Sequence, residues 1–132
     1  MDQYDAKILI AFGETFSGNE ELLNWLLNNG FQELAALSSS IRGSREAADW
    51  LMKNGYPHFV ALDLAIDHNQ DSYNWLMKNG YSFYATFADA CNKDEMAIKW
   101  FQDNDLKVFL FLVAKINHFR DNQTFDYHKL RF

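Results

Sequence analysis

The residues that could do chemistry in this chain are few, and the single cysteine is the first of them. Cys91 stands midway between Ile66 and Ile116, one 25-residue step from each. Because isoleucine fills the equivalent positions, we expect Cys91 to be a core side chain and not a nucleophile. One cysteine also excludes a disulfide within the chain.

The histidines and serines give no catalytic or metal-binding pattern. His68 and His118 are two 25-residue steps apart, or about 20 Å at roughly 10 Å per packed helix layer, which is too far to share a metal ion. The Ser38–Ser40 run has no G-x-S-x-G context, and no phosphate-binding glycine loop occurs. We therefore expect no enzyme activity, no cofactor and no metal.

The strongest regularity concerns the elements that would position any site. The four tryptophans are evenly spaced, at positions 25, 50, 75 and 100. Six positions before each stands a side chain that can cap a helix N-terminus, and an Asn-Gly pair, Asn-Asp in the last case, begins four positions after it. Each unit is thus predicted to begin with a helix of about 10 residues. The caps are Asn19, Ser44, Asn69 and Asp94, and the positions after the asparagines are Gly30, Gly55, Gly80 and Asp105.

A second helix is predicted after each glycine, because apolar residues recur there at steps of three and four. Pro57 falls in its first turn, where a missing N–H costs little. The stripe positions are Phe31, Leu34, Leu37 and Ile41, then Tyr56, Phe59, Leu62 and Ile66, then Tyr81, Tyr84, Phe87 and Cys91, then Leu106, Phe109, Leu112 and Ile116.

These patterns predict one all-α domain, an α-solenoid of about four helix-turn-helix repeats. The repeats are 19–43, 44–68, 69–93 and 94–118. A half-repeat, 1–18, precedes them with Leu9, Phe12 and Phe16 in the stripe, and 119–132 forms a C-terminal cap. Such short helices are stable only by burial against neighbours, so each indole is expected to be hidden between one unit and the next.

Residues 43–55, which end in Leu51-Met52-Lys53-Asn54-Gly55, resemble the capped first helix of ankyrin-type repeats, which ends in Leu-Leu-x-x-Gly. The chain has no Thr-Pro-Leu-His segment, and its unit is shorter than the ankyrin period, which is about 33 residues. The unit length is similar to that of leucine-rich variant repeats. Both resemblances imply an α-solenoid whose relatives mostly bind other proteins.

The second helices carry small residues, alanine and serine, between their stripe positions. In a curved stack these belong on the concave wall, which we expect to present a protein-binding or peptide-binding surface. The candidate partner-binding residues on it are His58, Asp63, Phe83, Tyr84 and Asp89. Two alternatives remain open: a small-molecule or enzyme pocket that uses Asp63 or Asp89, or a structural array that only self-associates.

Charge and hydropathy narrow the partner and the location. A net charge of −6 argues against nucleic acid or an anionic membrane as partner. No segment resembles a secretory signal or a transmembrane helix, so a cytoplasmic protein is expected. The apolar run Phe109–Val113 has no fifth unit beside it, so either the aromatic tail covers it in a monomer or a second copy does in a weak homo-oligomer.

Overall fold

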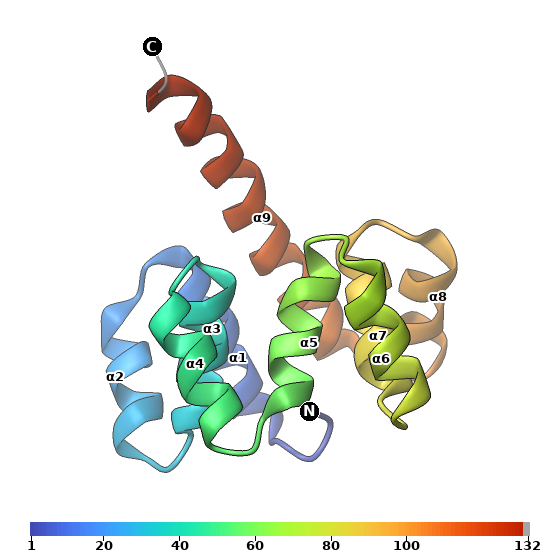
Figure 1. The fold of residues 1–132 in the computed structure, drawn as a ribbon, viewed down its shortest axis with the longest axis horizontal. Helices are drawn as coiled ribbons and strands as arrows, with labels where there is room; N and C mark the ends of the chain where they lie inside the picture. The colour runs from blue at the N-terminus through green and yellow to red at the C-terminus, as the bar shows by residue number, and fades with distance from the viewer. Residues whose placement is uncertain (131–132) are drawn as a thin grey trace.

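The computed structural model describes the backbone of residues 1–130 and the side chains of residues 1–122. Within that range the fold is all-α, without a strand (Figure 1). Its elements are α1 (Ala6–Glu14), a 3-10 turn η1 (Thr15–Ser17), α2 (Glu20–Asn28), α3 (Gln32–Ile41), α4 (Arg45–Lys53), α5 (Pro57–Ile66), α6 (Gln70–Lys78), α7 (Ser82–Cys91), α8 (Glu95–Asp103) and α9 (Lys107–Leu130).

The helix boundaries follow the 25-residue spacing. The helices α2, α4, α6 and α8, called here the outer helices, are equal in length and begin directly after the predicted cap. Gly30, Gly55 and Gly80 have φ between 83° and 89°. In the fourth turn Asp105 takes the same left-handed conformation with φ 55°, although it carries a side chain. The predicted starts and ends of the four outer helices are therefore confirmed.

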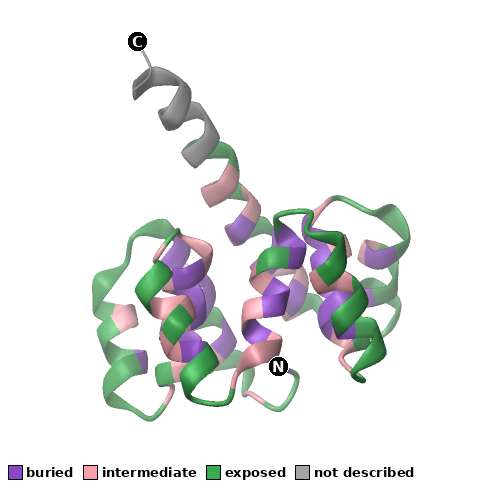
Figure 2. Ribbon diagram, viewed as in Figure 1, coloured by how far each residue is buried: buried purple, intermediate pink, exposed green. Residues whose placement is uncertain are grey.

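The core lies along the other five helices, α1, α3, α5, α7 and α9, called here the inner helices. Figure 2 shows most buried residues on them. Eleven of the sixteen predicted stripe residues are fully buried, whereas Ile41 and the first residue of each stripe, Phe31, Tyr56, Tyr81 and Leu106, are partly buried. The three residues predicted for the stripe of segment 1–18 are also buried: Leu9, Phe12 and Phe16.

The last helix, α9, does not end at residue 118, where the fourth predicted repeat ends. It continues to Leu130 and leaves the packed body (Figure 1). The position of Asn19, Ser44, Asn69 and Asp94 is occupied here by Phe119, which cannot cap a new helix N-terminus. The aromatic side chains expected to form the cap, Phe125 to Phe132, lie outside the described side chains.

The first and last inner helices pack against each other, which the sequence did not predict. Each inner helix contacts the next, and α9 also contacts α1. Gly13 lies directly against Phe111 and Leu112, so closely that an added Cβ would sit 2.6 Å from Phe111. The apolar run of α9 therefore packs against α1 of the same chain, a contact that neither expectation for this run included.

Polar contacts reinforce this junction. Lys115 of α9 lies 3.4 Å from the Glu14 carboxylate and donates a hydrogen bond to Ser17 Oγ at 3.1 Å. Further along α9, the Arg120 guanidinium donates to the carbonyl oxygens of Ile66 and Cys91 at 3.0 and 3.1 Å. These carbonyls belong to the last residues of α5 and α7, where a helix leaves acceptors without an internal partner. Arg120 thus joins three inner helices.

Candidate functional site

Local hydrogen bonds fix each outer helix and with it each tryptophan. At the N-terminus the cap side chain accepts from a backbone N–H, as Ser44 Oγ does from Ala47 at 3.1 Å. At the C-terminus an asparagine Nδ2 donates to the carbonyl oxygen of the tryptophan four positions earlier, over 2.7–2.8 Å. The asparagine of each Asn-Gly pair, and of the Asn-Asp pair in the fourth unit, therefore satisfies one of the free carbonyls at the helix end. The asparagines are Asn29, Asn54, Asn79 and Asn104.

The prediction that the indoles are buried between units is wrong. Trp25, Trp75 and Trp100 are 37–42% exposed, and Trp50 is partly buried. The residue that follows the tryptophan is instead completely buried in each outer helix: Leu26, Leu51, Leu76 and Phe101. A short helix that rests on one narrow stripe buries only one such side chain deeply, and the adjacent indole lies at the edge.

Each of the first three indoles stacks on the ring six positions later. The centroid distances are 6.0 Å for Trp25 and Phe31, 6.2 Å for Trp50 and Tyr56, and 5.8 Å for Trp75 and Tyr81. One face of each indole is thus held by its own unit. In the fourth unit Leu106 replaces the ring, and Trp100 instead meets Phe83 edge-on at 6.2 Å.

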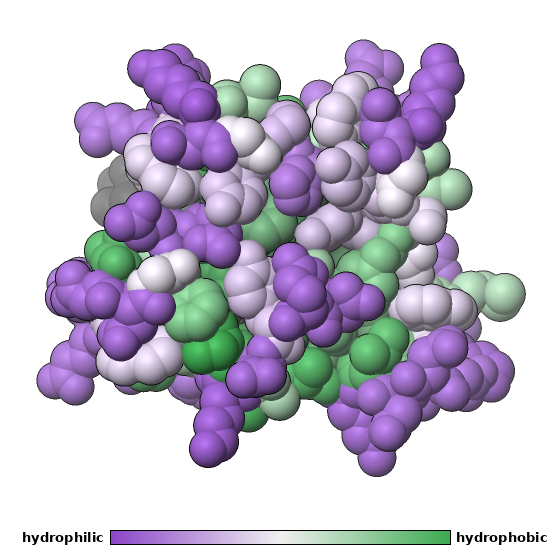
Figure 3. All heavy atoms as spheres, turned by 90° about the horizontal axis from the view of Figure 1, so that it is seen from below, coloured by the Kyte–Doolittle hydropathy of each residue, from purple (hydrophilic) through white to green (hydrophobic). Residues whose placement is uncertain are grey.

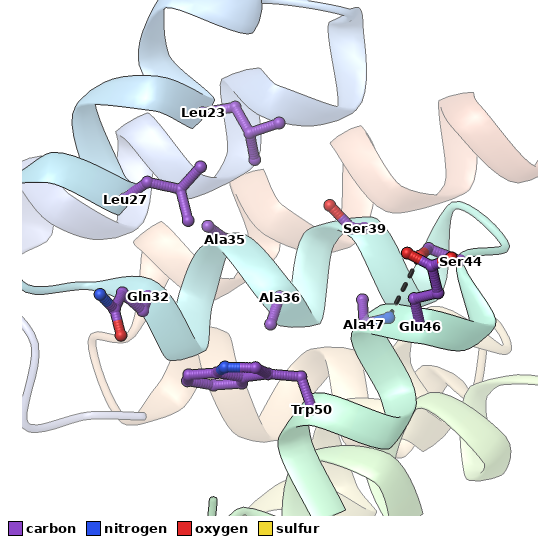
Figure 4. A pocket seen from close by; sticks show the side chains of 10 residues that line it. All are labelled: Leu23, Leu27, Gln32, Ala35, Ala36, Ser39, Ser44, Glu46, Ala47 and Trp50. Carbon is purple, nitrogen blue, oxygen red and sulfur yellow. Dashed lines mark hydrogen bonds between the residues drawn. The ribbon is translucent and has the colours of Figure 1, made fainter.

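A groove lies between α2 and α4, with α3 as its floor, and we call it groove 2. Its volume is about 410 Å³. Figure 4 shows Leu23 and Leu27 reaching toward α3 from α2, and the flat Trp50 indole on the other side. Ala35 and Ala36 are too small to fill the space between these walls. The groove therefore exists because the inner helix carries small residues there.

The same groove recurs one unit later, between α4 and α6 over α5. This groove 3 has a volume of about 330 Å³. Every residue that lines it stands 25 positions after a residue of groove 2, so Met52 follows Leu27 and Trp75 follows Trp50. The full lining is Met52, Pro57, Val60, Ala61, Leu64, Asp71, Ser72 and Trp75.

A related cavity, groove 1, lies between α1 and α2 and has a volume of about 420 Å³. Exposed aliphatic side chains accompany the indoles along the outer helices, since Leu27 is 42%, Met52 56% and Met77 51% exposed. The face seen in Figure 3 likewise shows hydrophobic residues between hydrophilic ones. Groove 1 is lined by Asp5, Lys7, Ile8, Ala11, Leu22 and Trp25.

Three of the five predicted partner-binding residues are packed together with aromatic neighbours. His58 is partly buried and stacks on Tyr81 at 4.8 Å between ring centroids, and burial lowers its pKa. Tyr84 is buried, which raises its pKa to about 12, and its hydroxyl accepts from the Met1 amino group at 2.8 Å. Phe83 packs edge-on against Phe109, with ring centroids 5.0 Å apart. None of the three lines a groove.

The two predicted aspartates lie apart from the grooves, each with a hydroxyl partner. Asp63 accepts from Ser40 Oγ at 2.5 Å, and its burial raises its pKa. Asp89 accepts from the Tyr73 hydroxyl at 2.8 Å and lines a polar cavity of about 340 Å³ that Asp63 does not line. The structure therefore does not bring the two carboxylates into one pocket.

The other chemically active side chains are placed as follows. Cys91 is buried as expected, and burial raises the pKa of its thiol to about 12. Among the described residues no cluster of three or more histidine, cysteine or acidic side chains is arranged to hold a metal ion. Within the same part of the chain, every helix is too short or too polar to cross a membrane.

The sequence reasoning missed the groove residues, although a signal for them was present. Positions 27, 52 and 77 are apolar and recur with the same period as the tryptophans, yet they fall outside the buried stripe. An apolar residue that repeats off the stripe is the pattern of a surface groove.

Comparison with known proteins adds no relative, because no family model, curated protein or solved structure matches this chain.

Proposed function

We propose that the chain is an array of four 25-residue helix pairs that binds a protein or peptide partner without catalysis, in the grooves between its units. The observation that carries this proposal is the recurrence of the same apolar groove at the same positions, with an indole at the surface as one wall. Exposed tryptophan and methionine side chains are typical of protein-binding surfaces.

The proposal retains the small residues of the inner helices from the concave-wall hypothesis, but it places the partner in the grooves between units. Small residues of the inner helices still contact the partner, since Ala35, Ala36 and Ala61 form the groove floors. The walls come from the outer helices. Asp63 and Asp89 are not required, because both already accept hydrogen bonds within the chain.

The test compares two double variants in affinity capture from the source cells. Leu27→Gln with Met52→Gln removes one apolar wall from groove 2 and one from groove 3. The control, Ile10→Gln with Met96→Gln, changes two exposed apolar side chains that line none of the three grooves. Both variants are first checked by circular dichroism, and glutamine preserves helix propensity.

We expect the parent and the control to retain the same specific proteins and the groove variant to lose them. Equal retention by all three, or no specific protein on any of them, would contradict the proposal. The Asp89→Asn variant tests whether partner binding depends on the Asp89 carboxylate. We expect this variant to retain the same proteins as the parent.

A further inference from the structure

We propose that the segment bound in grooves 2 and 3 is cationic and amphipathic. Its apolar side chains enter the grooves, and its lysine or arginine side chains meet the carboxylates at their rims. This inference rests on the proposed function, since it specifies the chemistry of the partner in those same grooves.

The first support is one carboxylate in each groove at equivalent positions. Glu46 lines groove 2, and Asp71, at the same position of the next unit, lines groove 3. Both side chains are exposed, and neither forms an ion pair within the described side chains. Each carboxylate lies in the same groove as an indole, Trp50 or Trp75, and an indole face also attracts a cation.

The second support is the net negative charge of the part of the chain that contains the grooves. Residues 1–106, which include both grooves, have 16 acidic and 7 basic side chains, so an approaching basic segment is attracted before contact. Groove 1 differs, because Lys7 stands beside Asp5 in its lining. The proposal is therefore confined to grooves 2 and 3.

The spacing of the two grooves indicates the pattern of the bound segment. Packed helix layers lie about 10 Å apart. A helical segment rises about 1.5 Å per residue, so apolar side chains about seven residues apart reach consecutive grooves. A peptide that presents leucines on one face at every seventh position, with lysines on the flanks, matches both the apolar walls and the carboxylates.

The experiment titrates the full-length protein with two synthetic peptides of three heptads, which share one leucine pattern and carry either lysine or glutamate at all flanking positions. Tryptophan fluorescence reports binding, because the peptides contain no tryptophan and the indoles form the groove walls. We expect saturable binding of the lysine peptide, with an emission shift to shorter wavelength, and binding of the glutamate peptide at least about tenfold weaker.

Two charge-reversal variants separate groove binding from general attraction to an acidic protein. Glu46→Lys with Asp71→Lys is expected to lower the affinity for the lysine peptide about tenfold. The control, Asp67→Lys with Asp121→Lys, makes the same change in net charge at exposed residues that line neither groove 2 nor groove 3. It is expected to lower the affinity for the lysine peptide by less than about threefold.

The outcomes distinguish this inference from the proposed function. Equal affinity for both peptides, or equal loss in both charge-reversal variants, overturns the cationic assignment and leaves groove binding intact. Failure of both peptides to bind also overturns it, and the capture experiment then decides separately whether the grooves bind a partner of other chemistry.

Discussion

Apolar side chains are tightly packed where α1 meets α9, but they are exposed in the grooves between the outer helices. At the junction, Gly13 lies against Phe111 and Leu112 without space for one more carbon atom. In grooves 2 and 3, leucine, methionine and tryptophan side chains line open cavities of about 410 and 330 Å³. The chain therefore covers part of its apolar surface in the fold and leaves other apolar surface, at repeated positions, exposed.

The largest effect that can sharpen this comparison comes from two adjacent residues of α4. Leu51 is fully buried, whereas Met52 is 56% exposed in groove 3. We expect Leu51→Ala to lower the free energy of unfolding by about 3 kcal/mol, through lost burial and the cavity left behind. Met52→Ala is expected to cost less than about 1 kcal/mol. Urea unfolding of the two variants measures both, and similar losses would show that the groove side chains are part of the core.

The next effect concerns the junction itself. Gly13→Leu places a side chain where even a Cβ meets Phe111, so we expect a loss of about 2 kcal/mol from overpacking. Phe111→Ala in the same chain should restore part of that loss, because it vacates the contested space. Ala114→Leu, at an exposed position of α9, is the control and should change stability by less than about 0.5 kcal/mol. Absence of coupling between residues 13 and 111 in the double-mutant cycle would mean that α1 does not cover α9 in solution.

The smallest effect lies in the turns that enter the outer helices. Gly18 and Gly43 have positive φ, and the equivalent His68 and Lys93 hold nearly the same conformation, at φ 69° and 68°, at a steric cost. We expect His68→Gly to raise stability by about 0.5–1 kcal/mol, since relief of strain exceeds the entropy gained by the unfolded chain. Gly43→Ala, which meets no atom within 4 Å, should lower it by about 1 kcal/mol. Thermal unfolding gives both values, and a destabilised His68→Gly variant would speak against a shared turn geometry.

The sequence predicted the helices well because their signals are local. Caps such as Ser44, turn residues such as Gly55 and the stripe through Phe59 and Leu62 act within a few residues of one another. The packing of α1 on α9 could not be read in this way, because it joins segments at opposite ends of the chain and depends on how the helix layers curve. Phe119 stands where the other units have an N-cap side chain, and this signalled that α9 continues. Residues 119–132 were instead assigned to a separate C-terminal segment from their composition alone.

The grooves were not predicted from the sequence, for a related reason. His58, Phe83 and Tyr84 were chosen from their place between small residues, but aromatic stacking draws them into packed contacts. Whether an indole such as Trp75 is hidden or half exposed depends on the angle between neighbouring helices, which periodicity does not specify.

The central claim, that the grooves are open in the free protein, is tested most directly by acrylamide quenching of tryptophan fluorescence in the folded full-length chain. All four tryptophans of the sequence are on the outer helices, so the signal comes from them alone. The half-exposed indoles predict a quenching constant clearly above zero and below that of the unfolded chain, independent of protein concentration. A constant near zero, or one that falls as concentration rises, would contradict the claim, because the grooves would then be filled by the chain itself or by a second copy.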